Sequence, residues 1–148
     1  ASISAGHYHT VGITTSGVAY AWGYNVYGQL GDGTTTDRLT PRRTLNFLVW
    51  ASISAGQRNT VGLTTSGEVY AWGRNSYGQL GDGTTTQRTT LVLVSGGHTW
   101  VSISAGVYHT VGITTRGDAY AWGRNNTGQL GDGTTTRRTT PGLVSPRP

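Results

Sequence analysis

Apolar and polar residues alternate along two short stretches near the start of the chain. In residues 9–14 a valine and an isoleucine fall on one side, and in residues 18–22 Tyr20 and Trp22 share one face while two alanines share the other. Side chains that alternate with a period of two are typical of β-strands. No window has apolar residues at helical spacing, and glycine interrupts every candidate helix. We therefore expect strands in both stretches and no helix.

Two apolar segments follow a long connection. The connection covers residues 23–40 and is rich in glycine and threonine. Residues 48–53 are apolar and lead into the next part of the chain, and residues 91–94 predict a shorter fourth strand. We therefore expect three or four short strands in every 50 residues or so.

The whole pattern repeats with a period of 50 residues. The segment Ala-Ser-Ile-Ser-Ala-Gly at residues 1–6 returns at 51–56 and, with one change, at 101–106, and residues 1–40 and 51–90 differ at 10 of 40 positions. Short strands repeated in this way predict an array of small sheets, in which small residues on one strand face allow close stacking and aromatic residues on the other fill the gap. We expect one repeat domain, residues 1–148, made of units 1–50, 51–100 and 101–148.

Each unit carries one run of small, aromatic and amide residues. In the first unit, residues 5–10 read Ala-Gly-x-x-His-Thr and residues 17–31 read Gly-x-x-Tyr-Ala-Trp-Gly-x-Asn-x-x-Gly-Gln-Leu-Gly. The run recurs in the other two units, where only Asn59 replaces the histidine. It resembles the repeat of the regulator of chromosome condensation family. The resemblance implies an all-β fold, a β-propeller of four-stranded antiparallel blades, usually seven per ring.

Three blades are too few to close a ring. Propellers have about 4 to 8 blades, so two chains with six blades fit this range, and three chains with nine do not. Each open end would lose up to roughly 10 kcal/mol of the stabilisation that comes from burying apolar surface. We expect a homodimer whose ring is completed by self-association, with strand exchange across residues at the two ends of the chain. These closure residues are Ala1, Ile3, Leu143 and Val144.

Composition excludes several kinds of chemistry. The chain has no cysteine, which excludes disulfides, thiolate metal sites and cysteine nucleophiles. No carboxylate cluster accompanies the four histidines, and one aspartate stands alone in each Leu-Gly-Asp-Gly loop, where an Asx turn explains it better than calcium. No apolar run approaches the ~20 residues of a membrane span. We therefore expect a soluble, non-enzymatic protein without cofactor or metal.

Candidate binding residues are found where the three units differ while the framework stays fixed. Such positions are exposed in a repeat protein, and tyrosine and arginine are enriched at binding hot spots. The expected partner-binding loop residues are His7, Tyr8, Tyr24, Arg58, Arg74, Tyr108 and Arg124. By contrast, the repeated tryptophans are expected in the structural core, and they are Trp22, Trp72 and Trp122.

One arginine recurs at the same loop position of every unit. In a closed ring Arg38, Arg88 and Arg138 would form a basic ring suited to acidic partners. Alternatively, they pair with the aspartates of the repeated loops, which are Asp32, Asp82 and Asp132. The net charge of +5 comes entirely from arginine and is modest, so nucleic acid is the less favoured partner.

The family resemblance implies several activities, and the residues favour one of them. Light-sensing members carry tryptophan directly after Ala-Gly, where this chain has His7, Gln57 and Val107, and no insertion is present that could support nucleotide exchange on a GTPase. We therefore expect a self-assembling scaffold that presents loops for protein–protein recognition. There are two alternatives. The first is a protein without a ligand of its own, either an engineered or amplified structural protein or a fragment of a larger seven-bladed propeller. The second is a binder of nucleic acid or chromatin through the basic ring.

Overall fold

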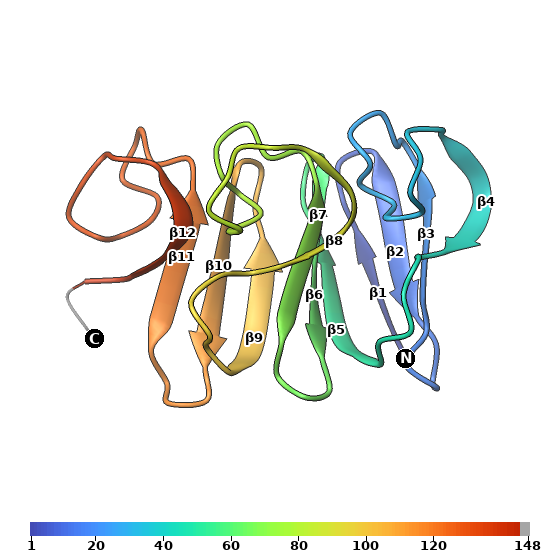
Figure 1. Ribbon diagram of the computed structural model, residues 1–148, viewed down its shortest axis with the longest axis horizontal. Helices are drawn as coiled ribbons and strands as arrows, with labels where there is room; N and C mark the ends of the chain where they lie inside the picture. Colours follow the sequence, from blue (N-terminus) through green and yellow to red (C-terminus); the bar gives the residue numbers. More distant parts are fainter. Residues whose placement is uncertain (146–148) are drawn as a thin grey trace.

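The computed structural model describes residues 1–145 as three four-stranded antiparallel sheets, which we call blades 1, 2 and 3 (Figure 1). Blade 1 consists of β1 (Ser2–Ala5), β2 (His9–Ile13), β3 (Ala19–Gly23) and β4 (Arg38–Arg43). Blade 2 consists of β5 (Trp50–Ala55), β6 (Asn59–Thr64), β7 (Val69–Gly73) and β8 (Arg88–Leu93). Blade 3 consists of β9 (Trp100–Ala105), β10 (His109–Thr114), β11 (Ala119–Gly123) and β12 (Arg138–Leu143). The described residues contain no helix, and the predicted fold class is confirmed.

The fourth strand of blade 2 begins earlier than the sequence pattern predicts. In blade 2 it starts at Arg88 and ends at Leu93, whereas the apolar run predicted a strand over residues 91–94. The first residues of β8 are polar and lie on the outer edge of the sheet, where β7 is the only neighbouring strand. Because an edge strand is open to solvent on one side, it needs no alternating apolar pattern.

Every blade has two chemically different faces. In blade 1, Thr10 pairs with Trp22 across β2 and β3, and Val11 pairs with Ala21. Successive side chains of a strand point to opposite sides, and paired residues share a side. We call the side with Trp22 and its equivalents the tryptophan face, and the side with Val11 and its equivalents the valine face.

The cores of the molecule lie between blades, where unlike faces meet. The valine face of blade 1 contributes Val11 and Ala21 to a cluster with Trp72 from the tryptophan face of blade 2. The valine face of blade 2 forms the corresponding cluster with Trp122 of blade 3. Trp72 and Trp122 are fully buried, as predicted. Small residues opposite large indoles therefore set the spacing of the blades.

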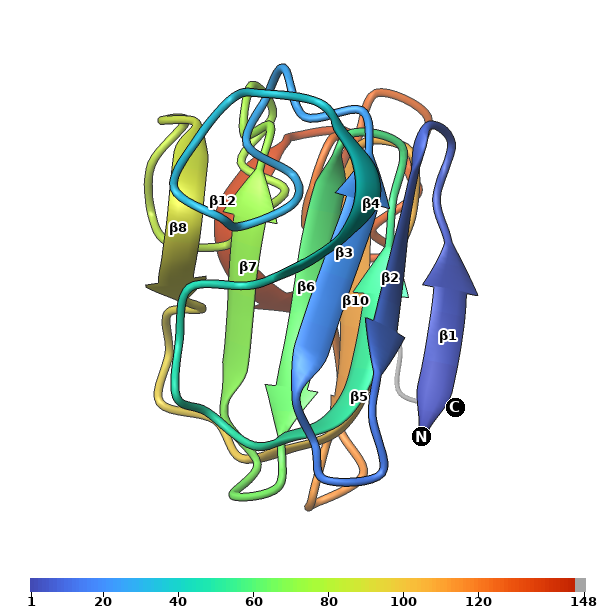
Figure 2. The same ribbon diagram turned by 90° about the vertical axis from the view of Figure 1, so that its right-hand side faces the viewer.

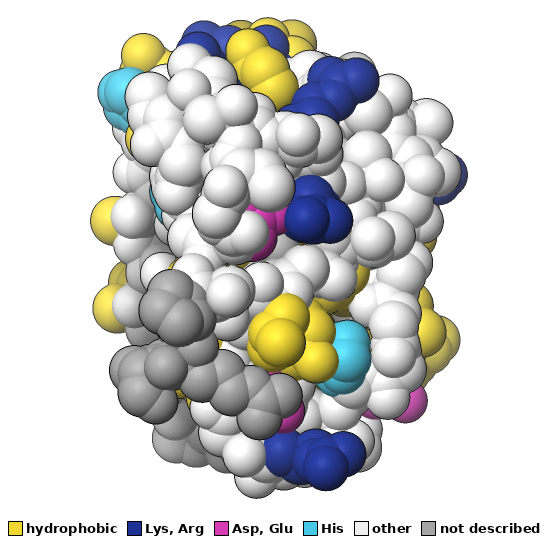
Figure 3. Space-filling model, turned by 90° about the vertical axis from the view of Figure 1, so that its left-hand side faces the viewer, with side chains coloured by type: hydrophobic (Ala, Val, Ile, Leu, Met, Phe, Trp, Pro, Cys, Tyr) yellow, Lys and Arg dark blue, Asp and Glu magenta, His cyan; other side chains and the backbone are white. Residues whose placement is uncertain are grey.

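The two outermost faces of the array have no blade against them. Figure 2 views the tryptophan face side of blade 1, where Ile3 is 72% exposed. On the valine face of blade 3, Val111 and Ile113 are 37% and 44% exposed, and Figure 3 shows hydrophobic side chains at the surface on this side. The prediction that Trp22 is a core residue is wrong for the isolated chain: it is only partly buried, because none of the described blades packs on this face.

Strand exchange is not needed to complete a blade. Blade 1 has four strands of its own, and Leu143 ends β12, which pairs with β11 of blade 3. Val144 follows that strand and donates its backbone N–H to the carbonyl oxygen of Ala119 in the same blade. The prediction that Leu143 and Val144 are donated to another molecule is therefore corrected. Ala1 and Ile3, at the opposite end, are exposed.

Candidate functional site

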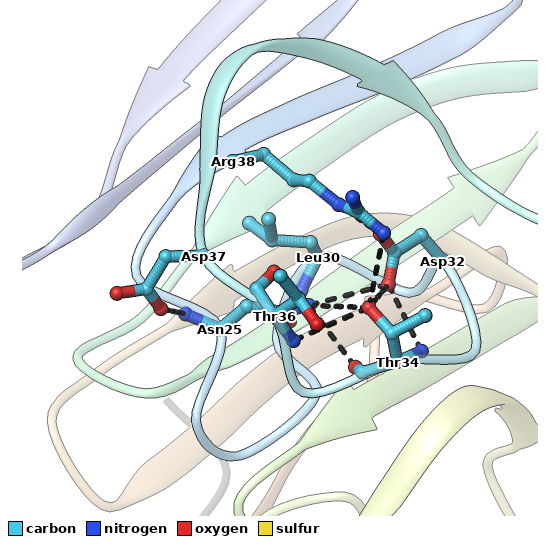
Figure 4. A network of polar contacts seen from close by, with 7 residues as sticks. All are labelled: Asn25, Leu30, Asp32, Thr34, Thr36, Asp37 and Arg38. Atoms are coloured by element: carbon cyan, nitrogen blue, oxygen red, sulfur yellow. Dashed lines mark hydrogen bonds and ion pairs between the residues drawn. The ribbon is translucent and has the colours of Figure 1, made fainter.

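A network centred on one buried asparagine holds the long loop of each unit in place (Figure 4). In blade 1, Nδ2 of Asn25 lies 3.2 Å from Oδ1 of Asp32 and 3.0 Å from the carbonyl oxygens of Thr34 and Thr36. Oδ1 of Asn25 accepts a hydrogen bond from the backbone N–H of Leu30. The same bonds recur around Asn75 and Asn125 in the other units. The loops are therefore rigid platforms rather than flexible tethers.

Each loop also contains an ion pair between the repeated aspartate and arginine. Nε of Arg38 lies 2.8 Å from Oδ2 of Asp32, and equivalent contacts join Arg88 to Asp82 and Arg138 to Asp132. Burial alone would raise the pKa of Asp32, but hydrogen bonds from Thr34 and Arg38 outweigh it and hold that pKa below its ordinary value. Of the two interpretations of these arginines, the structure shows the pairing. The basic ring of Arg38, Arg88 and Arg138 is thus neutralised by carboxylates of its own loops.

Arginine and tyrosine side chains interleave at the end of the blades that carries these loops. The guanidinium carbon of Arg74 lies 5.1 Å from the ring centroid of Tyr27 and 5.6 Å from that of Tyr108. Arg124 lies 5.1 Å from the ring of Tyr77 and 5.2 Å from the ring of Tyr108. Cation–π contacts of this length are attractive and hold the side chains in one arrangement. They connect residues from all three blades.

The row continues over blade 1 with aromatic rings alone. The rings of His7 and Tyr8 stack with centroids 4.2 Å apart, and Tyr8 lies 5.7 Å from Tyr24. Tyr24 lies 6.4 Å from Tyr27, whose ring is also covered by Arg58 at 5.3 Å. We call the whole row the arginine–tyrosine surface. It consists of His7, Tyr8, Tyr24, Tyr27, Arg58, Arg74, Tyr77, Tyr108 and Arg124.

All seven residues selected from the sequence as partner-binding candidates lie in this row. Two members, Tyr27 and Tyr77, were missed because they are identical in the first two units and resemble framework residues. The signal that could have found them is the change to Thr127 in the third unit. The structure places the ring of Tyr27 between Arg58 and Arg74, and the ring of Tyr77 against Arg124 and Tyr108, so both rings connect neighbouring blades.

The arginines of this surface carry charge that no carboxylate balances. Within residues 1–145, the ion pairs are those of the three loop arginines, and none involves Arg58, Arg74 or Arg124. Their contacts are instead to neutral groups, such as Oγ of Ser76, which accepts a hydrogen bond from Nε of Arg74. A guanidinium stacked on a ring keeps its N–H edge free for bidentate contact with a carboxylate. The arrangement can therefore bind acidic groups.

His9 lies between blades 1 and 2 and takes no part in this surface. Its side chain is 3% exposed, and Nε2 lies 2.9 Å from Oγ1 of Thr60. Since Thr60 donates its hydroxyl hydrogen to the carbonyl oxygen of Gln29, it accepts the hydrogen bond from His9. Burial lowers the pKa of His9 from 6.5 to about 4, so the ring is neutral near pH 7.

This buried histidine predicts a pH dependence of stability. The lowered pKa means that His9 stabilises the fold fully above pH 6.5, and that this contribution is lost as the pH falls towards 4. Between pH 7 and pH 4 the unfolding free energy should fall by up to roughly 3 kcal/mol more than in the His9→Asn variant. Asparagine occupies the equivalent position 59, which makes it a matched control. Urea denaturation at both pH values measures the difference; equal losses in the two proteins would contradict the account.

Among residues 1–145, no three His, Cys, Asp or Glu side chains gather closely enough to hold a metal ion. The same residues include no helix that could span a membrane.

Comparison with known proteins identifies the repeat. The family model of the regulator of chromosome condensation (RCC1) repeat matches residues 16–63, 66–113 and 116–148, and a second model of the same repeat matches residues 1–29, 50–79 and 100–129. A segment of 41 residues is 49% identical to the ultraviolet-B receptor UVR8 of Arabidopsis thaliana. This segment covers 28% of the chain and spans only 9% of that receptor.

Solved structures with the same blade arrangement include two eukaryotic propeller proteins. Human WBSCR16 superposes with a TM-score of 0.89 at 19% identity, over 99% of this chain and 38% of that one. Yeast RCC1 (Prp20), solved bound to Kap60, superposes with a TM-score of 0.87 at 23% identity, over 98% of this chain and 37% of that one. These likenesses establish the fold, and the family models extend over all three units. The chain therefore belongs to the regulator of chromosome condensation (RCC1) repeat family.

Proposed function

We propose that this chain is a non-enzymatic propeller scaffold. It closes a six-bladed ring with a second copy of itself and binds a protein partner through the arginine–tyrosine surface. The observation that carries this proposal is the continuous row of stacked arginines and tyrosines across all three blades. Such residues dominate the binding energy of many protein interfaces.

The chemistry of the row favours a partner with an acidic segment. Arg58, Arg74 and Arg124 present positive charge without an ion-pair partner among the described residues. These arginines and the tyrosine rings that they contact already hold one another in place. Binding a partner therefore costs little additional side-chain entropy. The loops beneath are fixed by the asparagine networks. A rigid surface with unbalanced positive charge is suited to carboxylates displayed by another protein.

The solved relatives support protein recognition as the class of function. Yeast RCC1 (Prp20) was solved with the protein Kap60 bound to it. The structure of Prp20p from Saccharomyces cerevisiae, 24% identical over 98% of this chain and 38% of that one with a TM-score of 0.85, was described with its binding to Gsp1p and histones. RCC1-like propellers are generally non-enzymatic, which supports the scaffold proposal.

Ring closure is supported by the two outermost faces. The residues exposed there, such as Ile113, are equivalent to residues that are buried between the blades, such as Leu63. If each face buries an area of standard size, ~800 Å², its apolar part contributes up to roughly 10 kcal/mol. That is comparable to the net stability of a typical domain. A second copy of the chain carries both faces that are needed to cover them.

Loss of two arginines should weaken acidic binding at the arginine–tyrosine surface. Arg74→Ala combined with Arg124→Ala is expected to lower the affinity for a fluorescently labelled polyglutamate peptide about tenfold or more, measured by anisotropy at low salt. Arg116→Ala removes an exposed arginine from the opposite end of blade 3 and should leave the affinity unchanged. Tighter binding of a duplex DNA of the same length than of the peptide would favour the nucleic-acid alternative and contradict this proposal.

A further inference from the structure

We infer that the second copy packs head to tail on the first. The new interface has the same register as the two interfaces between neighbouring blades inside the chain, which we call joins. The tryptophan face of blade 1 in one copy packs on the valine face of blade 3 in the other. This inference rests on the proposed ring and specifies how the ring closes. It assigns partners to named atoms on both outermost faces.

Three hydrogen bonds recur at both interfaces between blades inside the chain. At the first join, Oγ of Ser4 accepts from the backbone N–H of Ala55 at 3.1 Å, and Thr60 Oγ1 donates to the carbonyl oxygen of Gln29 at 2.7 Å. At the second join, the bond from Ala105 N to Ser54 Oγ is 3.0 Å, and the bond from the threonine hydroxyl to the carbonyl oxygen is again 2.7 Å. One set of contacts thus defines how any blade sits on the next.

A backbone bond at the outer side completes this set. The N–H of Gly33 donates to the carbonyl oxygen of Thr89 at 3.1 Å, from the loop of blade 1 to the outer strand of blade 2. The N–H of Gly83 donates to Thr139 at 2.9 Å in the same way. The bonds therefore fix each join at three separate points, two near the inner strands and one near the outer strand.

Each outermost face carries the donor and acceptor groups that are equivalent to one side of these three hydrogen bonds. On blade 1 they are the backbone N–H of Ala5, the hydroxyl of Thr10 and the carbonyl oxygen of Leu39. On blade 3 they are the hydroxyl of Ser104, the carbonyl oxygen of Gln129 and the N–H of Gly133. Neither Thr10 Oγ1 nor Ser104 Oγ has a hydrogen-bond partner among residues 1–145. Taken in the order given, each donor or acceptor on blade 1 has a complementary group on blade 3.

The space beside Gly131 fits the partly exposed Trp22. A Cβ at Gly31 would lie 2.8 Å from Nε1 of Trp72, and one at Gly81 would lie 2.6 Å from Nε1 of Trp122, so each glycine makes room for the indole of the next blade. At Gly131 no tryptophan is near, and the nearest atom belongs to Val144 at 3.2 Å. The indole of Trp22 from a second copy occupies the equivalent place.

This pairing also determines the symmetry of the assembly. Each copy contributes both of its outermost faces, so two copies form two identical joins and leave no face uncovered. A dimer that paired like faces would place Trp22 against Trp22. It would leave the hydroxyl of Ser104 and the valine face of blade 3 uncovered. The head-to-tail arrangement alone satisfies both faces.

One substitution on each face tests this register. Thr10→Glu places a charge on the tryptophan face of blade 1, and Val111→Glu places one on the valine face of blade 3. Each variant alone should convert the dimer into a monomer in light scattering, with an unchanged circular dichroism spectrum. Arg116→Glu, at an exposed turn away from both faces, is the control and should remain dimeric.

A cysteine pair gives the positive test. Because the chain has no cysteine of its own, Ala5→Cys with Ser104→Cys should give a disulfide between two chains on a non-reducing gel. The pair Ser54→Cys with Ala105→Cys has the same relation within one chain and should give no covalent dimer. A dimer that survives in either glutamate variant would overturn the head-to-tail register alone. A monomeric unmodified chain would instead overturn the proposed ring.

Discussion

Replacing Trp72 with alanine should lower the free energy of unfolding by about 3–5 kcal/mol, the range for large buried aromatic residues. Trp72 is fully buried between blades 1 and 2, where its ring lies 5.7 Å from that of Trp50. Its Nε1 donates a hydrogen bond to the carbonyl oxygen of Gln29 at 3.0 Å. The variant leaves a cavity and removes one of the two hydrogen bonds that the Gln29 carbonyl oxygen accepts, the other coming from the hydroxyl of Thr60. Urea denaturation followed by circular dichroism measures the loss.

The equivalent tryptophan of blade 1 is the matched control. In the Val111→Glu background, which keeps the chain monomeric, Trp22 has no blade against it. Trp22→Ala should then cost clearly less stability than Trp72→Ala. Equal losses of unfolding free energy would mean that packing between blades is not what makes Trp72 stabilising. That result would contradict the claim that the core lies between the blades.

Replacing Asn75 with alanine should lower the free energy of unfolding by about 2–3 kcal/mol. Its amide nitrogen donates to the carbonyl oxygens of Thr84 and Thr86, and its Oδ1 accepts from the backbone N–H of Leu80. Removal leaves the buried N–H of Leu80 and the two part-buried carbonyl oxygens without this partner, and an unpaired group costs about 1–3 kcal/mol when water cannot reach it. Thermal or urea unfolding measures the change.

The neighbouring Ser76→Ala variant is the control for the loop. Ser76 is exposed and accepts a hydrogen bond only at the surface, so its loss should change stability by about 0.5 kcal/mol or less. If Asn75→Ala were as mild as Ser76→Ala, the loop would not depend on the asparagine network, and its rigidity would have another cause.

The strands with alternating side chains were predictable because one physical signal dominates them. Val11 and Trp22 fall on opposite faces of adjacent strands, and this period of two predicted β2 and β3. The early start of β8 at Arg88 was not predictable in this way, since an edge strand exposed to solvent has no apolar period. The pairing of Asp32 with Arg38 remained one of two alternatives because sequence does not specify side-chain direction.

The interaction surface was predictable only in part. Variation among otherwise identical units selected Arg74 and Tyr108, but it could not select Tyr27, which is the same in the first two units. The partial exposure of Trp22 was missed because its pattern is identical to that of Trp72. What differs is the position of its blade in the array, and that is a property of the assembled molecule.

The molar mass of the protein in solution tests the central claim most directly. Size-exclusion chromatography with light scattering should give about twice the 15.6 kDa of one chain, as expected for two copies that close six blades. A mass of 15.6 kDa that persists at high protein concentration would show that both outermost faces stay open to water, and a mass of three chains would replace six blades with nine. Either result would contradict the ring.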